Sequence, residues 1–127
     1  MDRLTLTDLL LIAEATLDTD ADQLARIIDV PSAESALAAP FAGFGELDFY
    51  PDPAVKAAIL CSRLLRNHPF PDGNKRVAFL AMLELLARDG HAWTRPKDDE
   101  AAEMIERVGA RDVTEEDFAV WVAEHAG

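Results

Sequence analysis

The stretch 68–76 reads HPFPDGNKR and places a histidine, a carboxylate and two cations within nine residues. A histidine titrates near neutral pH, so His68 could accept the proton of an attacking hydroxyl. The proline that follows disfavours helical geometry at His68, and we therefore expect the imidazole to leave the end of a helix. Phe70 is expected to hold this loop against the core. The sequence thus predicts a general base at a fixed position.

The second half of the stretch suits a phosphate ligand. Asp72 offers hard carboxylate oxygens, which suit Mg²⁺. Gly73 can adopt a positive φ and lets the backbone approach a ligand closely. Asn74, Lys75 and Arg76 are predicted to form the first turn of a helix, where free N–H groups and the helix dipole attract anions. A base, a metal carboxylate and a phosphate site together indicate phosphoryl or nucleotidyl transfer.

Other interpretations of these residues remain open. His68 could be a structural histidine at a helix end, and Asp72 could cap the next helix in addition to binding metal. Cations in a first helical turn are unfavourable without an anion, which favours a ligand beside Lys75 and Arg76. Arg66 could contact a phosphate or a partner, or could be a solvated charge.

Length and charge limit the classes of partner. The chain of 127 residues suits one domain, 1–127, and half of its residues are hydrophobic. With 12 basic and 24 acidic side chains, the formal net charge is -12. Such a surface repels nucleic acid and anionic lipid, so we expect neither as a direct partner, and it suits a basic protein. No targeting or transmembrane segment is evident, which predicts a cytoplasmic location.

Helical periodicity dominates the chain and predicts an all-α fold, a compact helical bundle. The expected helix starts are Thr5, Asp20, Ser32, Asp52, Asp98 or Asp99, and Thr114. Residues 77–87 are apolar on all sides except for Glu84, which predicts a central buried helix directly after the active-site loop. Residues 40–51 carry two glycines and four aromatics and predict a loop or short hairpin. Its aromatics either pack on the core or form a flap that presents a partner peptide.

The stretch 68–76 resembles the signature of the Fic/Doc family, His-x-Phe-x-(Asp/Glu)-Gly-Asn-(Gly/Lys)-Arg. Lys75 in the eighth place resembles the Doc, or death-on-curing, toxin branch. The similarity extends to Phe49-Tyr50-Pro51, Lys56-Ala57-Ala58 and Arg66-Asn67. The resemblance implies a helical bundle, His68 as the base, Asp72 on Mg²⁺, and residues 73–76 around the phosphates of ATP. Arg76 is expected to be a catalytic residue as well.

The resemblance also implies an activity. Typical Fic members transfer AMP from ATP to a protein hydroxyl, and they carry Gly in the eighth place and a second Arg three residues after the first. This chain has Lys75 and Phe79 there. Doc-like members act as kinases instead, moving the γ-phosphate to a threonine of elongation factor Tu, which stops translation. We therefore expect a toxin with protein kinase activity, with a serine or threonine of a translation factor as its target.

Two alternatives remain: an AMP transferase of the Fic type, and a catalytically silent module that only binds an antitoxin. Fic enzymes are often inhibited by a helix with the pattern (Ser/Thr)-x-x-x-Glu, and no Ser or Thr here has Glu four residues later. The resemblance therefore implies inhibition in trans, by an antitoxin protein whose disordered tail folds onto the toxin.

Overall fold

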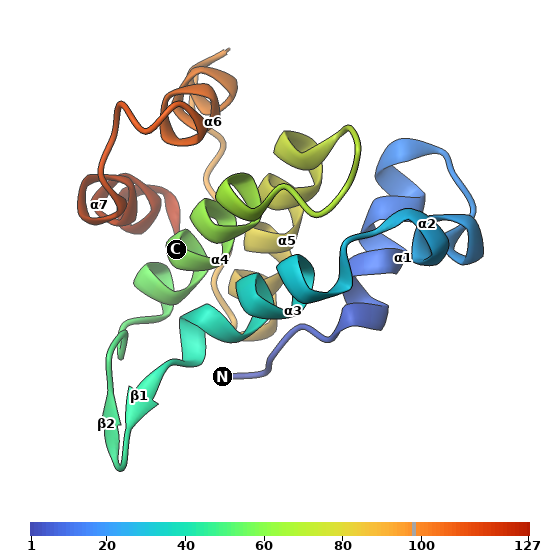
Figure 1. Ribbon diagram of the computed structural model, residues 1–127. Coiled ribbons are helices and arrows are strands. Elements are labelled where there is room, and N and C mark those ends of the chain that lie inside the picture. The colour runs from blue at the N-terminus through green and yellow to red at the C-terminus, as the bar shows by residue number, and fades with distance from the viewer. Residues whose placement is uncertain (98) are drawn as a thin grey trace.

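The computed structural model describes residues 1–97 and 99–127 and confirms an all-α bundle (Figure 1). The elements follow one another in the order α1 (Leu6–Leu17), α2 (Ala21–Ile27), α3 (Val30–Ala38), the 3₁₀ helix η1 (Ala39–Phe41), β1 (Gly43–Phe44), β2 (Leu47–Asp48), α4 (Pro53–Asn67), α5 (Asn74–Arg88), α6 (Glu100–Gly109) and α7 (Glu115–His125). Among the described residues, no helix is both long and apolar enough to cross a membrane.

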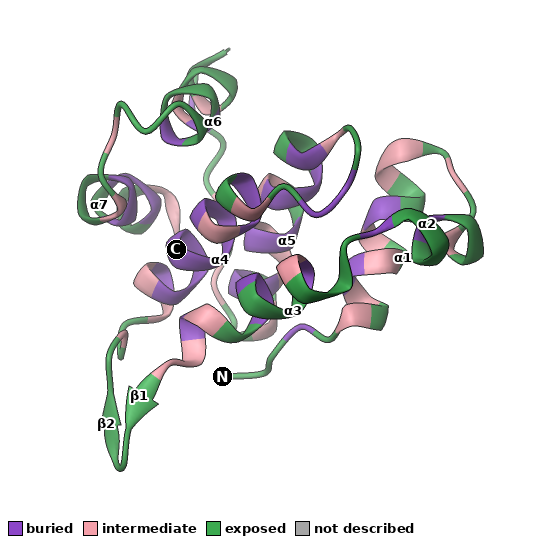
Figure 2. Ribbon diagram, viewed as in Figure 1, coloured by how far each residue is buried: buried purple, intermediate pink, exposed green. Residues whose placement is uncertain are grey.

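Helix α4 occupies the middle of the bundle. It packs against α3, α5, α6, α7 and η1, whereas α5 packs against α1, α4 and α6. Figure 2 shows buried residues along much of α4 and on part of α5, as well as on helices around them. Helix α5 follows the active-site loop as predicted, but it also has a solvent side, on which Leu80 is exposed. The innermost helix is thus the one before the loop, and the active-site loop connects the two helices that form the core.

Most of the helices begin at the capping residues that the sequence predicts. Thr5 and Asp8 form a reciprocal capping box at α1, and Asp20, Asp52 and Thr114 accept hydrogen bonds from the first turns of α2, α4 and α7. Helix α6 begins after Asp99, and the alternative start at Asp98 lies outside the described residues.

Two details of the early helices differ from the prediction. Helix α3 begins at Val30, with Asp29 as its cap and Ser32 donating its backbone N–H to the Asp29 side chain. Ser32 was the wrong start because Asp29 precedes a proline at the second helical position and satisfies the same free N–H groups. Helical spacing predicts that Leu24, Ile27 and Ile28 share one face of α2, but Ile27 is exposed, since α2 ends there and only Ile28 turns into the core.

Strands β1 and β2 form a two-stranded antiparallel hairpin that projects from the bundle (Figure 1). Gly45 adopts a positive φ of 61° at the first position of the two-residue turn, as primed hairpin turns require. The interpretation that its aromatics pack on the core is wrong for Phe44 and Phe49, which are 82% and 53% exposed. Leu47 is exposed as well, so the hairpin presents apolar side chains to solvent.

Lys56 attaches the hairpin to α4. Its ammonium donates to both carboxylate oxygens of Asp48, at 2.8 and 2.9 Å, and to the backbone oxygen of Pro40 at 3.1 Å. Helical spacing of the polar residues of α4 predicts a polar stripe that includes Lys56 and Ser62, but both side chains are buried in the protein. The hydrogen bond from Lys56 holds the pKa of the Asp48 carboxyl below its usual value.

Candidate active site

His68 is the residue at which the chain leaves α4. Its N–H donates to the Leu64 carbonyl, and its backbone is left-handed, with φ 50° and ψ 57°. The prediction that His68 leaves helical geometry is confirmed, although through a left-handed turn and not through the extended conformation that a following proline favours. A left-handed backbone is uncommon for a residue with a β-carbon. His68 is exposed to solvent.

Asn74 and Phe70 hold the loop in shape. The Asn74 carboxamide accepts the Phe70 N–H at 3.0 Å through Oδ1 and donates to the Phe70 carbonyl at 2.8 Å through Nδ2. Phe70 is 1% exposed, which confirms it as the side chain that fixes the loop to the core. Both polar atoms of the Asn74 side chain are therefore engaged with the loop. The backbone N–H of Asn74 is the group that could still contact a nucleotide, and this contact stays a prediction.

Helix α5 begins with an open N-terminus. Gly73 is its N-cap residue, with φ 79°, and among the described residues no side chain caps the first turn. The positive φ favours glycine at position 73, and a β-carbon there would stand 2.2 Å from Leu17 Cδ2, so the Leu17 side chain would have to move. Lys75 and Arg76 are exposed in this turn. Free N–H groups, the positive dipole end and two cations make this an anion-binding arrangement.

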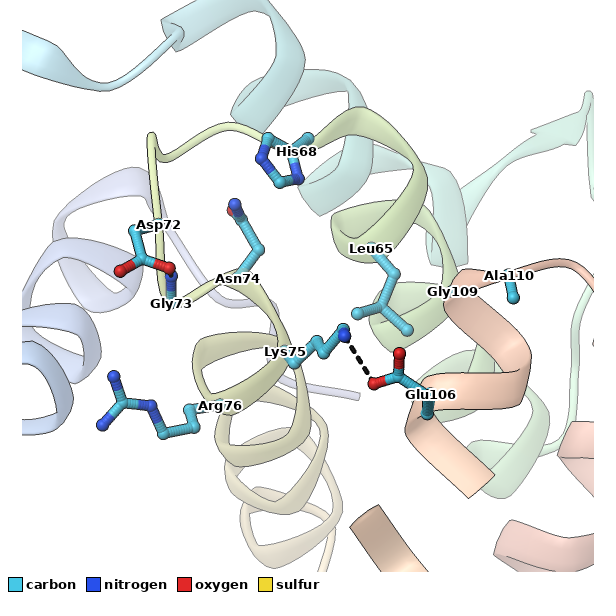
Figure 3. A pocket seen from close by; sticks show the side chains of 10 residues that line it. All are labelled: Leu65, His68, Asp72, Gly73, Asn74, Lys75, Arg76, Glu106, Gly109 and Ala110. Carbon is cyan, nitrogen blue, oxygen red and sulfur yellow. Dashed lines mark hydrogen bonds and ion pairs between the residues drawn. The ribbon is translucent and has the colours of Figure 1, made fainter. Parts of the chain in front are cut away.

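The residues of the stretch converge on a pocket of about 620 Å³ (Figure 3). Its lining comprises Leu65, His68, Asp72, Gly73, Asn74, Lys75, Arg76, Glu106, Gly109 and Ala110. The volume falls in the range of ligand-binding cavities in proteins. All six predicted site residues other than Arg66 line this pocket. Five of them come from the loop and the start of α5, and His68 comes from the end of α4.

Figure 3 shows that the start of α5 divides these side chains between two sides. Lys75 points towards α6, whereas Asp72 and Arg76 point the opposite way. There, Asp72 and Arg76 also line a second cavity of about 200 Å³, together with apolar residues of α1, α2 and the loop. A ligand on the helix N-terminus can thus be contacted by a cation from either side.

Glu106 is a site residue that the sequence analysis did not find. It lies on α6 and pairs with the Lys75 ammonium across the pocket, at 2.5 Å from Oε2 to Nζ (Figure 3). From the sequence alone, the acid-rich stretch 98–106 that contains Glu106 indicates only the solvated face of a helix. No local signal separates Glu106 from its acidic neighbours, because the pair joins residues 31 positions apart.

Arg66 is the one predicted site residue that does not line the pocket. Its guanidinium lies 3.6 Å from Glu115, which Arg63 also binds at 2.9 Å. Partial burial raises the pKa of Glu115, but the hydrogen bond and charge of Arg63 outweigh it, so the pKa lies below its usual value. Arg66 therefore joins α4 to the start of α7, and its contact with phosphate stays a prediction.

Asp72 meets the requirements of a Mg²⁺ ligand. Its Oδ1 accepts the Gly73 N–H at 2.8 Å, and the carboxylate is exposed at the pocket. Within residues 1–97 and 99–127, no three acidic, histidine or cysteine side chains gather into a metal site. A single carboxylate still suits Mg²⁺, which commonly takes one or two protein ligands and completes its shell with phosphate oxygens and water.

Comparison with known proteins decides the family. The sequence profile of the Fic/DOC family matches residues 3–86, which include the whole stretch 68–76. The chain belongs to the Fic/Doc family. A curated relative named Toxin Doc, from Mycolicibacterium smegmatis, is 33% identical over 102 residues, which cover 80% of this chain and 78% of that protein. The family match spans α1 to α5 apart from the end of α5, so Glu106 lies beyond it.

Proposed function

We propose that this protein is the toxin of a toxin–antitoxin pair and transfers the γ-phosphate of ATP to a serine or threonine hydroxyl of a translation factor, which inhibits translation. Elongation factor Tu is the target by analogy with the Doc branch. The observation that carries the proposal is the exposed His68 beside the open, cationic N-terminus of α5 in one pocket. The relationship to Toxin Doc of M. smegmatis supports the biological role.

The proposed reaction is a displacement at phosphorus. The target hydroxyl oxygen forms a bond to the γ-phosphorus, the bond from that phosphorus to the β–γ bridging oxygen breaks, and ADP leaves. His68 takes the hydroxyl proton. The N–H groups of the first turn of α5, with Lys75 and Arg76, stabilise the charge on the transferred group. Asp72 would hold Mg²⁺, which neutralises phosphate charge when bound.

Phe79 favours γ-phosphate transfer over AMP transfer. It takes the place of the second Arg of typical Fic members, and its ring packs edge-on against Trp93, with 5.8 Å between centroids. It lines a separate apolar cavity with Trp93 and Arg95 and does not reach the pocket of His68. Position 79 therefore offers no cation to hold the β- and γ-phosphates while the α-phosphate reacts.

The hairpin and the surface charge support protein partners. Exposed Phe44, Leu47 and Phe49 give the hairpin the apolar surface that a flap for a target peptide needs. The net charge of -12 complements a basic, disordered antitoxin tail. A translation factor as target places the protein in the cytoplasm.

Two labelled forms of ATP test the proposal. Purified protein is incubated with Mg²⁺, a translation factor and ATP labelled at either the γ or the α position. We expect γ-label on the factor and none from α-label. His68→Ala should abolish the signal, while His91→Ala, which alters a histidine outside the pocket bonded to Asp89 and the Gly127 carbonyl, should retain it. Transfer of α-label would establish AMP transfer instead, and no transfer of either label would support the silent binding module.

A further inference from the structure

Lys75, one of the two cations that the proposed site offers to phosphate, forms an ion pair with Glu106. Lys75 lies in the first turn of α5, and Glu106 reaches it from α6 on the opposite wall of the pocket (Figure 3). Both side chains line the same cavity as His68. A carboxylate therefore neutralises one of the two cations that would bind phosphate.

We infer that Glu106 competes with the ligand for Lys75 and sets the affinity of this pocket for polyphosphate. The inference rests on the anion-binding part of the proposed function and not on the transfer step. In the free protein, Glu106 takes the ammonium. A polyphosphate that reaches the start of α5 exchanges with the carboxylate, which then turns to solvent.

Exposure makes this exchange feasible. The Lys75 and Glu106 side chains are 57% and 66% exposed, and exposed ion pairs contribute little net stability. A polyphosphate carries several charges and also engages the N–H groups of the helix start, so it is the stronger partner for Lys75. Gly109, which has no side chain, and the small Ala110 line the same wall and leave the ligand space beside Glu106.

The opposite role, in which Glu106 holds Lys75 in position for the ligand, predicts the opposite result. A positioning partner would increase phosphate affinity, and its removal would weaken binding. A competing partner lowers affinity by occupying Lys75 and by repelling the incoming anion, so its removal strengthens binding. The sign of the change in affinity decides between the two roles.

Binding of inorganic triphosphate tests the inference without any transfer reaction. Isothermal titration calorimetry at low ionic strength compares the wild-type protein with Glu106→Gln, which keeps the size of the side chain and removes its charge. We expect the variant to bind triphosphate about three- to tenfold more tightly, the scale of one solvent-exposed charge. Glu103→Gln is the matched control, because Glu103 is exposed on the same helix, changes the net charge equally and does not line the pocket.

A second comparison assigns the gain to Lys75. In a Lys75→Met background, Glu106→Gln should improve triphosphate affinity much less, since no ammonium is released. Equal or weaker binding by Glu106→Gln, an equal gain in Glu103→Gln, or no triphosphate binding in any variant would each overturn the inference. If Glu106→Gln binds more tightly but the wild-type protein transfers no label from ATP, the inference stands and the kinase proposal fails.

Discussion

The two ends of α4 use lysine in opposite ways. Near its start, Lys56 is buried, and its ammonium is fully engaged by Asp48 and the Pro40 carbonyl. Beside its end, Lys75 of α5 is exposed and pairs with one exposed partner, Glu106. The first lysine fixes the hairpin to the bundle, and the second faces an open pocket. Burial, more than residue type, therefore separates a structural cation from one that can bind a ligand.

The same contrast applies to the surroundings of the two lysines. At the hairpin end, neutralisation of Lys56 is complete within the protein. At the pocket end, the start of α5 has no side-chain cap among the described residues, and Arg76 makes no ion pair with any of them. The free N–H groups at the start of α5 and the guanidinium of Arg76 are expected to draw an anion in a protein that is otherwise strongly acidic.

The largest expected effect is at the pocket end. His68→Ala should lower the rate of phosphate transfer by about 10²- to 10⁴-fold, the usual contribution of a general base. Because His68 is exposed, the melting temperature should stay close to that of the wild-type protein. Kinetics with labelled ATP and thermal denaturation measure the two quantities. A large loss of stability would instead make His68 a structural helix-end residue.

The next effect compares the two ends of α5. Gly73 and Gly90 both have φ near 80°, but a β-carbon meets Leu17 only at Gly73. Gly90→Ala should cost about 1 kcal/mol from backbone strain alone. Gly73→Ala should cost about 2 kcal/mol, since the Leu17 side chain must also move, and it should also weaken ATP binding.

Urea denaturation of both variants measures this difference. Leu17→Ala in the Gly73→Ala background should recover the steric part of the loss and leave the strain. If Gly73→Ala and Gly90→Ala lose the same stability, the close approach of Leu17 to the loop is not a constraint on this site.

Much of the helical fold and of the pocket end could be predicted from the sequence, because these features depend on local patterns. Caps such as Thr5 and Asp52, the glycine at 73 and the cationic first turn of α5 are set by neighbouring residues. Contacts between distant elements were not predictable. The pairing of Lys75 with Glu106 and of Arg66 with Glu115 depends on how α6 and α7 pack against the rest of the bundle. Nothing in the acid-rich C-terminal segment distinguishes Glu106 and Glu115 from their acidic neighbours.

Burial was also hard to judge from the sequence where a polar residue is paired inside the fold. Lys56 reads as part of a polar stripe, yet it is buried because Asp48 arrives from the hairpin. For some apolar residues, the sequence predicted burial where the structure shows exposure. Phe44 and Phe49 are hydrophobic but exposed, since the hairpin projects beyond the bundle and the described part of the chain does not cover them.

An identical substitution at the two lysines sharpens the comparison. Lys56→Met keeps most of the side-chain volume but removes the bonds to Asp48 and Pro40, and should cost about 1–3 kcal/mol. Lys75→Met should change stability by less than about 0.5 kcal/mol and instead weaken triphosphate binding. Urea denaturation measures the stability of both variants, and calorimetry measures their affinity for triphosphate. A stability loss of equal size in both would contradict the distinction drawn between the lysines.

The smallest effect concerns pH and the ion pair of Arg63 with Glu115. The pKa of Glu115 is lowered in the folded protein, so this carboxylate stabilises the fold above its unfolded pKa of about 4.3, and the contribution is lost as pH falls through the folded pKa. The free energy of unfolding should therefore decline between about pH 5 and pH 3, and less steeply in Glu115→Gln. Parallel pH curves for the two proteins would exclude a contribution from this pair.

Backbone amide shifts test the central claim most directly, that the start of α5 beside His68 binds a triphosphate. In a ¹H–¹⁵N correlation spectrum titrated with ATP and Mg²⁺, the amides of Asn74, Lys75 and Arg76 and the His68 ring should shift together and saturate, while the hairpin amides of Phe44 and Leu47 stay in place. If ATP leaves the amides of 74–76 unmoved, or moves the hairpin instead, then this helix terminus is not the nucleotide site.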